Sequence, residues 1–390
     1  MPRGLAMFEP FPTNYVWNLS INLALEMGGS IGEIDVANRG TARAAEAGDS
    51  GVDAFFDTWL AMAARVREMA DADHGAGHKA SAAAKYRRAC AYLITAERMQ
   101  ASDYPPRQQA YADMLSAFAR YIEASGDPCE TVDIPYADSH YPALFCSAAT
   151  PNNPRPPCMI FCNGLDSVKE MVFLVGLPAA LRARGISCLI VDQPGVGGAL
   201  RRNKLPAIVE TEIWAGKAVD WLQARDDVDT DRIGMMGWSL GGYYAPRAAA
   251  FEKRFKLCVA WGANHEWGEV QQRRRRNEGE NPVPHYWAHV MWVWGQDRLE
   301  DFMALSERIT LTGAVEHITV PFLVVHGEND RQIPVEYAYR SHEQAVRSPR
   351  ADLKIFTARE GGVEHCSADN MEPVRSFIVD WVQDRFAEMT

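Results

Sequence analysis

The chain has 390 residues, which is enough for one large domain or two unequal ones. Hydrophobic residues make up 47% and charged residues 23%, close to the averages of folded globular proteins, and this excludes disorder along the whole chain. The formal net charge of −11 argues against a protein that binds nucleic acid or anionic lipid. We therefore expect a small-molecule ligand.

The sequence contains no targeting or membrane-spanning pattern. Residues 1–15 lack an apolar stretch of signal-peptide length, and no later segment approaches 18 uninterrupted apolar residues. Eight cysteines are scattered along the chain, several of them in apolar runs such as 158–162, which is typical of buried reduced thiols rather than disulfides or a zinc site. We expect a cytoplasmic protein that binds no membrane, metal or cofactor.

The N-terminal third, to about Ser125, is rich in alanine and patterned for helices. Apolar residues recur at helical spacing in 52–69, 85–99 and 108–122, and residues 71–77 supply a break between the first two of these stretches. Packing accounts for these apolar positions without any further role. We predict an N-terminal helical domain over residues 1–129.

The pattern changes after Gly126. Residues 130–134 and 143–147 are typical of an entry hairpin. Short apolar runs then alternate with helix-compatible segments; these runs are 158–162, 186–191, 232–236, 256–261, 321–325 and 353–356. Because such alternation is typical of a parallel sheet covered by helices on both faces, we predict a doubly wound, mostly parallel α/β domain over residues 130–390.

One interval between predicted strands, about 262–318, is longer than the others, and we predict that it forms a lid insertion. It contains Arg273 to Arg276, for which a solvated lid face is favoured over contact with an anionic substrate or nucleic acid. Trp287, Met291 and Trp294 lie at i, i+4 and i+7 of a predicted helix. This stripe is either core packing or a surface for an aromatic substrate.

The strongest chemical signal is the pattern Gly-Trp-Ser-Leu-Gly at 237–241, between a predicted strand and a predicted helix. A serine at such a turn has a strained backbone that projects its hydroxyl, and the small neighbours leave room for the turn. The alternative is a glycine-rich turn with a buried serine. We take Ser239 as the candidate nucleophile.

A serine hydroxyl needs a base to remove its proton and a carboxylate to orient that base. On this scaffold the order along the chain is serine, acid, histidine. Asp330 follows the predicted strand 321–325, and His365 follows the strand 353–356. Because catalytic groups gather at the carboxyl ends of parallel strands, we predict that these three side chains converge. The rival carboxylates are Glu328 and Asp369, and the rival histidines are His317 and His326.

The oxyanion formed by attack of Ser239 needs oriented hydrogen-bond donors. One predicted donor is the backbone N–H of Leu240, directly after the nucleophile. The other is the N–H of Leu165, in the loop after the strand 158–162, where Gly164 allows a close approach. Asp192, after the strand 186–191, is expected to shape its turn rather than to catalyse.

These motifs together resemble one family. Residues 163–171, 192–199, 237–250, 326–334 and 362–366 resemble the α/β-hydrolases that include bacterial 2,6-dihydroxypseudooxynicotine hydrolase, fungal polyketide-shortening hydrolases and FrsA-like proteins. The resemblance covers about 130–390, and the helical N-terminal segment fits more loosely. It departs from the family at Asn163, where a glycine is usual.

The resemblance implies a Ser/Asp/His triad at Ser239, Asp330 and His365, a homodimer, and a helical segment that closes the pocket. It also implies cleavage of a carbon–carbon bond next to a ketone in an aromatic or polyketide-like molecule, with a glutamate, Glu266 or Glu269, assisting. Hydrolysis of a carboxylic ester or lactone needs the same residues and is the alternative reaction. A non-catalytic regulatory or binding protein on this fold is the alternative from another class.

Overall fold

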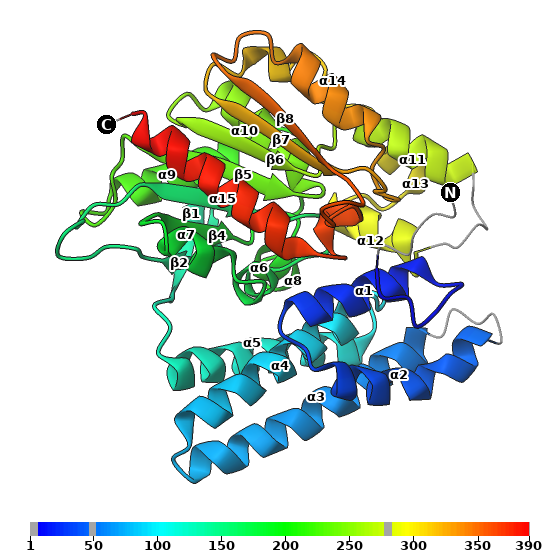
Figure 1. The fold of residues 1–390 in the computed structure, drawn as a ribbon. Helices are drawn as coiled ribbons and strands as arrows, with labels where there is room; N and C mark the ends of the chain where they lie inside the picture. Colours follow the sequence, from blue (N-terminus) through cyan, green and yellow to red (C-terminus); the bar gives the residue numbers. More distant parts are fainter. Residues whose placement is uncertain (1–6, 47–51, 277–282, 390) are drawn as a thin grey trace. The chain divides into compact units, whose positions relative to one another are not determined.

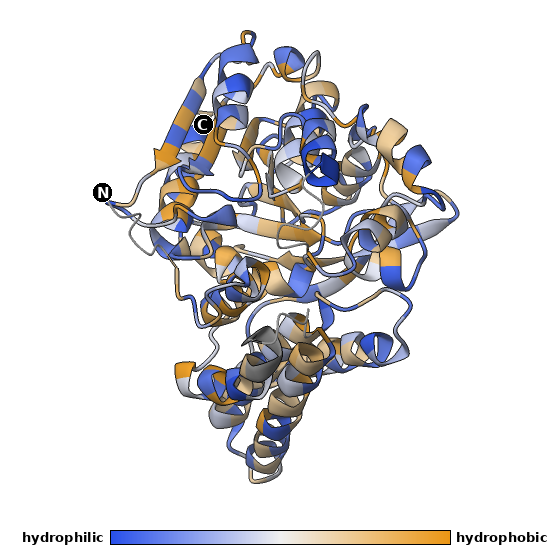
Figure 2. Cartoon of the chain, turned by 90° about the vertical axis from the view of Figure 1, so that its right-hand side faces the viewer, coloured by the Kyte–Doolittle hydropathy of each residue, from blue (hydrophilic) through white to orange (hydrophobic). Residues whose placement is uncertain are grey.

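The computed structural model describes residues 7–46, 52–276 and 283–389 of the chain, and Figure 1 shows their helices and strands. Hydrophobic and hydrophilic residues alternate along most of the helices, as expected for helices that bury one face (Figure 2). Among the described helices, none is long and apolar enough to cross a membrane.

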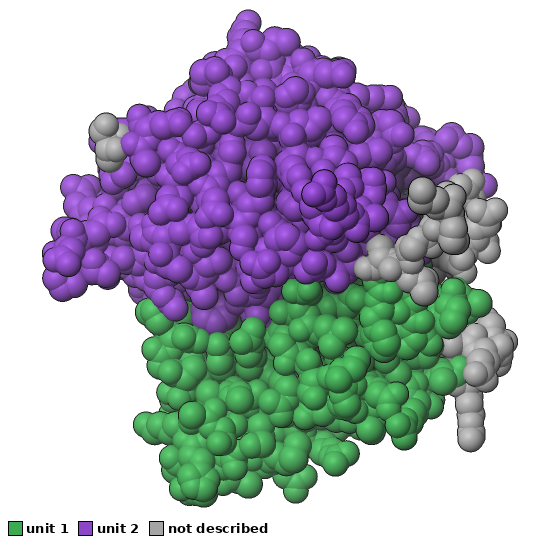
Figure 3. Space-filling model, viewed as in Figure 1, with its two compact units in different colours: residues 1–129, 279–289 green, residues 130–278, 290–390 purple. Residues whose placement is uncertain are grey.

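The chain forms two compact units, coloured separately in Figure 3. Unit 1 comprises residues 1–129 and 279–289, and unit 2 comprises residues 130–278 and 290–390. The boundary after residue 129 coincides with the predicted end of the helical domain. The stretch 279–289 lies inside the predicted lid insertion and groups with unit 1.

Unit 1 is built of helices, whose bounds are α1 Tyr15–Glu26, α2 Ile31–Glu46, α3 Val52–Gly75, α4 Lys79–Glu97 and α5 Pro105–Ser125. Helix α4 packs against both α3 and α5. The break predicted at 71–77 is wrong for its first residues, since α3 continues to Gly75. The last turns of α3 are held by α4, because Asp71 accepts a hydrogen bond from the Tyr86 hydroxyl at 2.6 Å and Asp73 pairs with Lys85.

Unit 2 contains, within the described residues, one eight-stranded sheet in the order β1-β2-β4-β3-β5-β6-β7-β8. The strands are β1 Glu130–Tyr136, β2 Ser139–Cys146, β3 Cys158–Cys162, β4 Ser187–Val191, β5 Ile233–Trp238, β6 Leu257–Trp261, β7 Phe322–Gly327 and β8 Ala351–Phe356. Strand β2 pairs antiparallel with β1 and β4, and all other pairs are parallel. The predicted doubly wound, mostly parallel α/β architecture is confirmed.

Helices cover this sheet in two sets. Their bounds are α6 Lys169–Leu174, α7 Leu177–Arg182, α8 Gly197–Arg201, α9 Glu212–Gln223, α10 Gly241–Phe251, α14 Glu336–Gln344 and α15 Met371–Ala387. Helix α9 packs on α10, and α15 packs on α7; in Figure 1 α15 crosses in front of the sheet. Every residue of β3, β4, β5 and β6 is buried, as expected for strands covered on both faces.

Where it is described, the interval between β6 and β7 holds three helices and a short 3-10 helix. They are α11 Trp267–Arg276, α12 Tyr286–Val293, α13 Leu299–Ser306 and η1 Val315–His317. A further 3-10 helix, η2 His365–Ser367, follows β8. Because β3, β5, β6, β7 and β8 run parallel, the loops that follow them emerge at the same edge of the sheet.

Candidate active site

Ser239 occupies the turn between β5 and α10. Its φ of 57° lies in the left-handed region that residues other than glycine seldom adopt. Its N–H donates to the Trp261 carbonyl at 3.0 Å, and its carbonyl accepts from the Gly242 N–H at 2.8 Å. A Cβ atom at Gly242 would lie 2.2 Å from the Gly262 carbonyl oxygen, so this turn requires glycine there. The strained turn therefore holds the serine at the carboxyl edge of the sheet.

His365 reaches Ser239 from the loop after β8. Its Nε2 atom lies 2.9 Å from the Ser239 Oγ, and its Nδ1 atom lies 2.8 Å from Oδ2 and 3.1 Å from Oδ1 of Asp330. This arrangement fits an imidazole that donates from Nδ1 to the carboxylate and accepts the serine proton at Nε2. The structure thus brings together the three side chains that the sequence placed after β5, β7 and β8.

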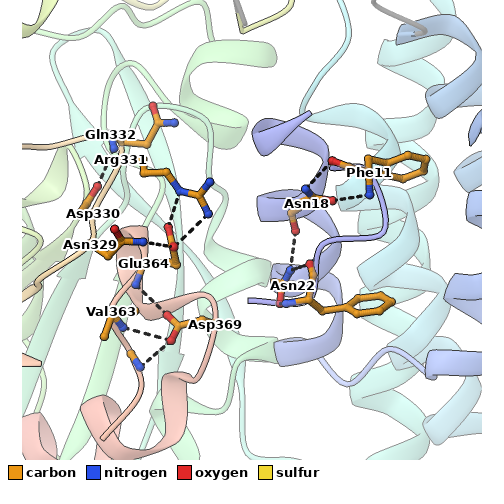
Figure 4. A network of polar contacts seen from close by, with 12 residues as sticks. Phe11, Asn18, Asn22, Asn329, Asp330, Arg331, Gln332, Val363, Glu364 and Asp369 are labelled. Atoms are coloured by element: carbon orange, nitrogen blue, oxygen red, sulfur yellow. Dashed lines mark hydrogen bonds and ion pairs between the residues drawn. The ribbon is translucent and has the colours of Figure 1, made fainter. Parts of the chain in front are cut away.

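Backbone hydrogen bonds from its own loop hold the Asp330 carboxylate in place. Its side chain is 1% exposed, and Oδ1 accepts hydrogen bonds from the N–H groups of Gln332 at 2.8 Å and Ile333 at 2.9 Å. The bond to Gln332 is drawn in Figure 4. These contacts close the loop around the carboxylate and leave Oδ2 as the oxygen nearest to the His365 Nδ1.

The charges of the pair reinforce each other. Burial alone would raise the pKa of Asp330, but the His365 ring, together with the His326 ring and the Ile333 N–H, lowers that pKa below its ordinary value. Burial alone would lower the pKa of His365, yet the Asp330 carboxylate, followed by the Cys366 thiol, raises it well above 6.5. The carboxylate is therefore suited to stabilise an imidazolium.

The loop after β3 lies directly against the nucleophile. A Cβ atom at Gly164 would lie 2.9 Å from the Ser239 Cβ and 3.3 Å from its Oγ, so glycine permits this approach. The predicted donor Leu165 follows Gly164. In the described part of the chain the N–H of Leu240, the other predicted donor, has no hydrogen-bond acceptor. An N–H at this helix start is available to an oxyanion.

Side chains brace this loop. Ser167 accepts hydrogen bonds at its Oγ from the Gly164 N–H at 2.9 Å and from the Trp238 indole at 3.1 Å, and donates to the Asn163 Oδ1 at 2.8 Å. The Asn163 amide donates to the Val191 carbonyl at 2.9 Å. The departure from the family at Asn163 thus supplies two contacts that a glycine lacks.

A buried charged cluster lies after the ends of β3 and β4, and the sequence pattern singled out only Asp192 among its members. Asp192 accepts from the backbone N–H groups of Lys169 and Gly198, each at 2.8 Å, which agrees with its predicted turn-shaping role. The Lys169 ammonium lies 3.1 Å from Asp192 and 2.7 Å from Glu170. The available signal was a Lys-Glu pair at the start of an otherwise apolar helix.

The rival residues are engaged elsewhere. Glu328 accepts from the Ala358 N–H at 2.6 Å, and Asp369 accepts from three N–H groups at residues 362–364. The His326 Nε2 lies 3.0 Å from the Ile333 carbonyl, and the His317 ring packs on Phe251. The His326 Nε2 also lies 3.6 Å from Oδ2 of Asp330, farther than the His365 Nδ1 at 2.8 Å.

Glu266 and Glu269 line a cavity of about 410 Å³ together with Arg273, Arg276 and Glu307. Glu266 accepts from the Thr312 hydroxyl at 2.5 Å, and Glu269 accepts from the Tyr337 hydroxyl at 2.8 Å. Ser239 does not line this cavity. Both glutamates thus have hydrogen-bond partners, and the part that either plays at the serine stays a prediction.

The predicted stripe of Trp287, Met291 and Trp294 is unevenly buried. Helix α12 ends at Val293, and Trp294 is 2% exposed, with its ring packed against Trp267 at 5.7 Å between centroids. Trp287 and Met291 are partly exposed. Trp294 thus packs in the core, the first of the two interpretations of the stripe.

Among the described residues, no group of three His, Cys, Asp or Glu side chains is placed to hold a metal ion. A serine at a strand-to-helix turn of a mostly parallel sheet, with an acid and a histidine from later loops, defines the α/β-hydrolase class. Within this class the chain belongs to the FrsA-like esterase family, whose model, described as "Esterase FrsA-like", matches residues 55–276. A second model, "Prolyl oligopeptidase family", matches residues 215–387.

Sequence matches to individual hydrolases support membership of this family. The chain is 24% identical over 335 residues to the 2,6-dihydropseudooxynicotine hydrolase of Paenarthrobacter nicotinovorans, a match that covers 85% of this chain and 84% of that protein. It is 32% identical over 219 residues to the alpha/beta hydrolase xenA of Xenoacremonium sinensis, covering 53% and 51%.

A solved structure, the crystal structure of the 2,6-dihydroxy-pseudo-oxynicotine hydrolase, aligns with a TM-score of 0.74 at 21% identity, over 93% of this chain and 95% of that chain. This likeness shows a shared fold. The predicted family, fold and hydrolase class are confirmed.

Proposed function

We propose that this hydrolase acts through Ser239 as nucleophile, His365 as base and Asp330 as the acid that orients it. The observation that carries the proposal is the hydrogen-bonded chain from the serine hydroxyl through the imidazole to the carboxylate, with contacts of 2.9 and 2.8 Å. The N–H groups of Leu240 and Leu165 serve as the oxyanion hole. Within the described residues the N–H of Leu240 has no acceptor, and Gly164 approaches Ser239 closely; both observations support this assignment.

The preferred reaction is hydrolysis of a carbon–carbon bond next to a ketone in an aromatic or polyketide-like molecule. Support comes from the motif resemblance and from the bacterial relative, a 2,6-dihydropseudooxynicotine hydrolase that aligns over most of both chains. Such a bond breaks heterolytically only when the departing carbon is stabilised, as an enolate or as an electron-rich phenol ring.

The steps balance with the residues at hand. His365 Nε2 takes the Ser239 proton as Oγ attacks the ketone carbon, and the carbonyl oxygen becomes an oxyanion on the two N–H groups. Collapse of this adduct breaks the carbon–carbon bond, leaves its electron pair on the departing carbon, and returns the proton from the imidazolium to that carbon. Water, deprotonated by His365, then hydrolyses the acyl-enzyme to a carboxylic acid and free Ser239.

Hydrolysis of a carboxylic ester or lactone is the second candidate, because the matching family model is described as an esterase. It uses the same residues with an easier leaving group. Turnover of an acylphenol ketone and of an aryl ester with the same acyl group, followed by product analysis, separates the two reactions. Release of the acid and the phenol from the ketone supports carbon–carbon hydrolysis, whereas turnover of the ester alone contradicts it.

A non-catalytic binding protein on this fold is the candidate from another class. A fluorophosphonate probe tests it, because the probe forms a covalent bond only with an activated serine. We expect labelling of the wild-type protein at Ser239 and none of the S239A variant. Absence of any adduct in the wild-type protein would favour the binding function.

We further propose a homodimer in the cytoplasm. The motif resemblance supports the dimer, and the position of several cysteines in apolar runs such as 158–162 is compatible with a reducing compartment. Light scattering coupled to size-exclusion chromatography should give twice the mass of one chain; a mass of about 43 kDa would contradict the dimer.

A further inference from the structure

The two loops that carry Asp330 and His365 meet backbone to backbone. The Asn329 N–H donates to the Val363 carbonyl at 3.0 Å. A Cβ atom at Gly327 would lie 2.2 Å from the same carbonyl oxygen, so the loops approach as closely as glycine permits. A displacement of one loop relative to the other would therefore change the alignment of the Asp330 carboxylate with the His365 ring.

A buried carboxylate joins these loops at the same place. The Glu364 side chain is 1% exposed and accepts from the Asn329 amide at 2.5 Å. The Arg331 guanidinium donates to both of its oxygens, from Nε and Nη2, each at 3.0 Å (Figure 4). Asn329 and Arg331 are the two chain neighbours of Asp330, and Glu364 is the neighbour of His365. One carboxylate thus holds the residues on both sides of the acid.

The histidine loop is itself anchored. Asp369 accepts from the N–H groups of Gly362 at 2.8 Å, Val363 at 3.1 Å and Glu364 at 2.9 Å, and Figure 4 shows this fan of hydrogen bonds beside the Glu364 contacts. The backbone of residue 364 therefore has little freedom, and its side chain acts as a fixed point for the opposite loop.

We propose that Glu364 is a positioning residue that locks the acid loop to the histidine loop and so sets the alignment of Asp330 with His365. The inference rests on the proposed function of these two residues. A bidentate guanidinium–carboxylate contact fixes direction as well as distance, which suits such a lock better than a single hydrogen bond. A misplacement of about 1 Å in a catalytic group costs up to about a hundredfold in rate.

The test measures fluorophosphonate labelling of Ser239 in the wild-type protein and in E364Q, R331M and the double variant. E364Q keeps the shape of the side chain but removes the charge, and R331M removes the partner. The matched control is R350M: Arg350 is similarly exposed, 49% against 40% for Arg331, and pairs with Asp352 at the opposite end of β8. Thermal unfolding reports whether each variant is folded.

We expect each single variant to lower the maximal labelling rate by about ten- to a hundredfold, with little change in the probe concentration for half-maximal rate. The double variant should be no slower than E364Q, because both substitutions remove the same lock. If E364Q does not fold, R331M decides, since Arg331 is partly exposed. R350M should label as the wild type does.

Labelling of R331M and of folded E364Q within twofold of the wild type overturns the inference and leaves the proposed function standing. Additive losses in the double variant also overturn it, because the two residues would then act separately. A wild-type protein that is not labelled at all overturns the proposed function, and the inference with it.

Discussion

The Ser239 hydroxyl and the His365 ring are each expected to carry most of the rate at this site. Replacement of either by alanine should lower hydrolysis of an aryl ester by about 10³-fold or more, because the remaining donors cannot replace a nucleophile or its base. The fold should persist, since the backbone hydrogen bonds of Ser239 do not involve its side chain. Circular dichroism checks this point. The control H317A alters an exposed rival histidine; loss of activity there would count against the assignment.

The pH dependence of Ser239 labelling should depend on Asp330. This carboxylate raises the pKa of His365 well above 6.5. The neutral ring, which accepts a proton, is therefore populated only as the pH rises through the raised pKa. Labelling of the wild type should therefore increase with pH, with its midpoint above 6.5. D330N removes the raising charge, so its midpoint should move to lower pH while the maximal rate falls.

The control for this profile is E328Q, which alters an exposed rival carboxylate bonded to the Ala358 N–H. Its pH midpoint should equal that of the wild type. An unchanged midpoint in D330N, or a shifted one in E328Q, would mean that the acid has been misassigned.

Local pattern was enough to predict the catalytic candidates but not their supports. Ser239, Asp330 and His365 each follow an apolar run of strand length, and parallel strands deliver their following loops to one edge. Glu364 carries no such signal, because its partners come from a loop about 35 residues earlier in the chain. Which charged neighbour meets it depends on the register of β7 and β8, which the sequence pattern leaves undetermined.

At the scale of elements, the loop after β3 should lose its shape when Ser167 is removed. S167A leaves the Gly164 N–H and the Trp238 indole N–H as buried donors without this acceptor. Each such loss costs about 1–3 kcal/mol, and a displaced loop should also slow fluorophosphonate labelling by roughly tenfold, within the range for a misplaced catalytic group. Denaturant unfolding and labelling rates measure the two effects.

S376A serves as the control, because the Ser376 hydroxyl donates to Glu372 on the exposed side of α15. It should change neither quantity. If S167A labels at the wild-type rate despite being less stable, the hydrogen bonds of Ser167 support the fold without shaping the oxyanion loop.

Element ends were the least predictable features, for reasons that lie in tertiary contacts. Helix α3 extends through Asp71 and Asp73, residues of low helix propensity, and Tyr86 and Lys85 of α4 bind their carboxylates there. Helix α12 ends at Val293, one residue before the apolar stripe does. The Trp294 ring, directly after that point, packs on Trp267, a neighbour that helical periodicity does not encode.

At the scale of the whole molecule, the α/β architecture was predictable because its buried strands are continuous apolar runs. The grouping of residues 279–289 with unit 1 was not, since these residues lie far along the chain from the rest of that unit. Sequence pattern predicts helices and strands well. It predicts poorly to which compact unit a short segment belongs, because that depends on long-range packing.

The cysteines should report on the two units separately. Cys90 lies buried in α4 of unit 1, whereas Cys146, Cys158, Cys162, Cys188 and Cys258 lie buried in strands of the sheet. Burial raises the pKa of the Cys158 and Cys258 thiols well above the ordinary value, which suppresses the reactive thiolate. In native buffer iodoacetamide should therefore modify only the partly exposed Cys129 and Cys366.

With increasing urea the five sheet cysteines should become reactive together, because exposing one of them requires opening of the shared sheet. Cys90 should become reactive at its own urea midpoint. Peptide mass spectrometry after pulsed alkylation measures each site, and modification of any sheet cysteine in native buffer, or a spread of midpoints among the five, would contradict a sheet that opens as one cooperative element.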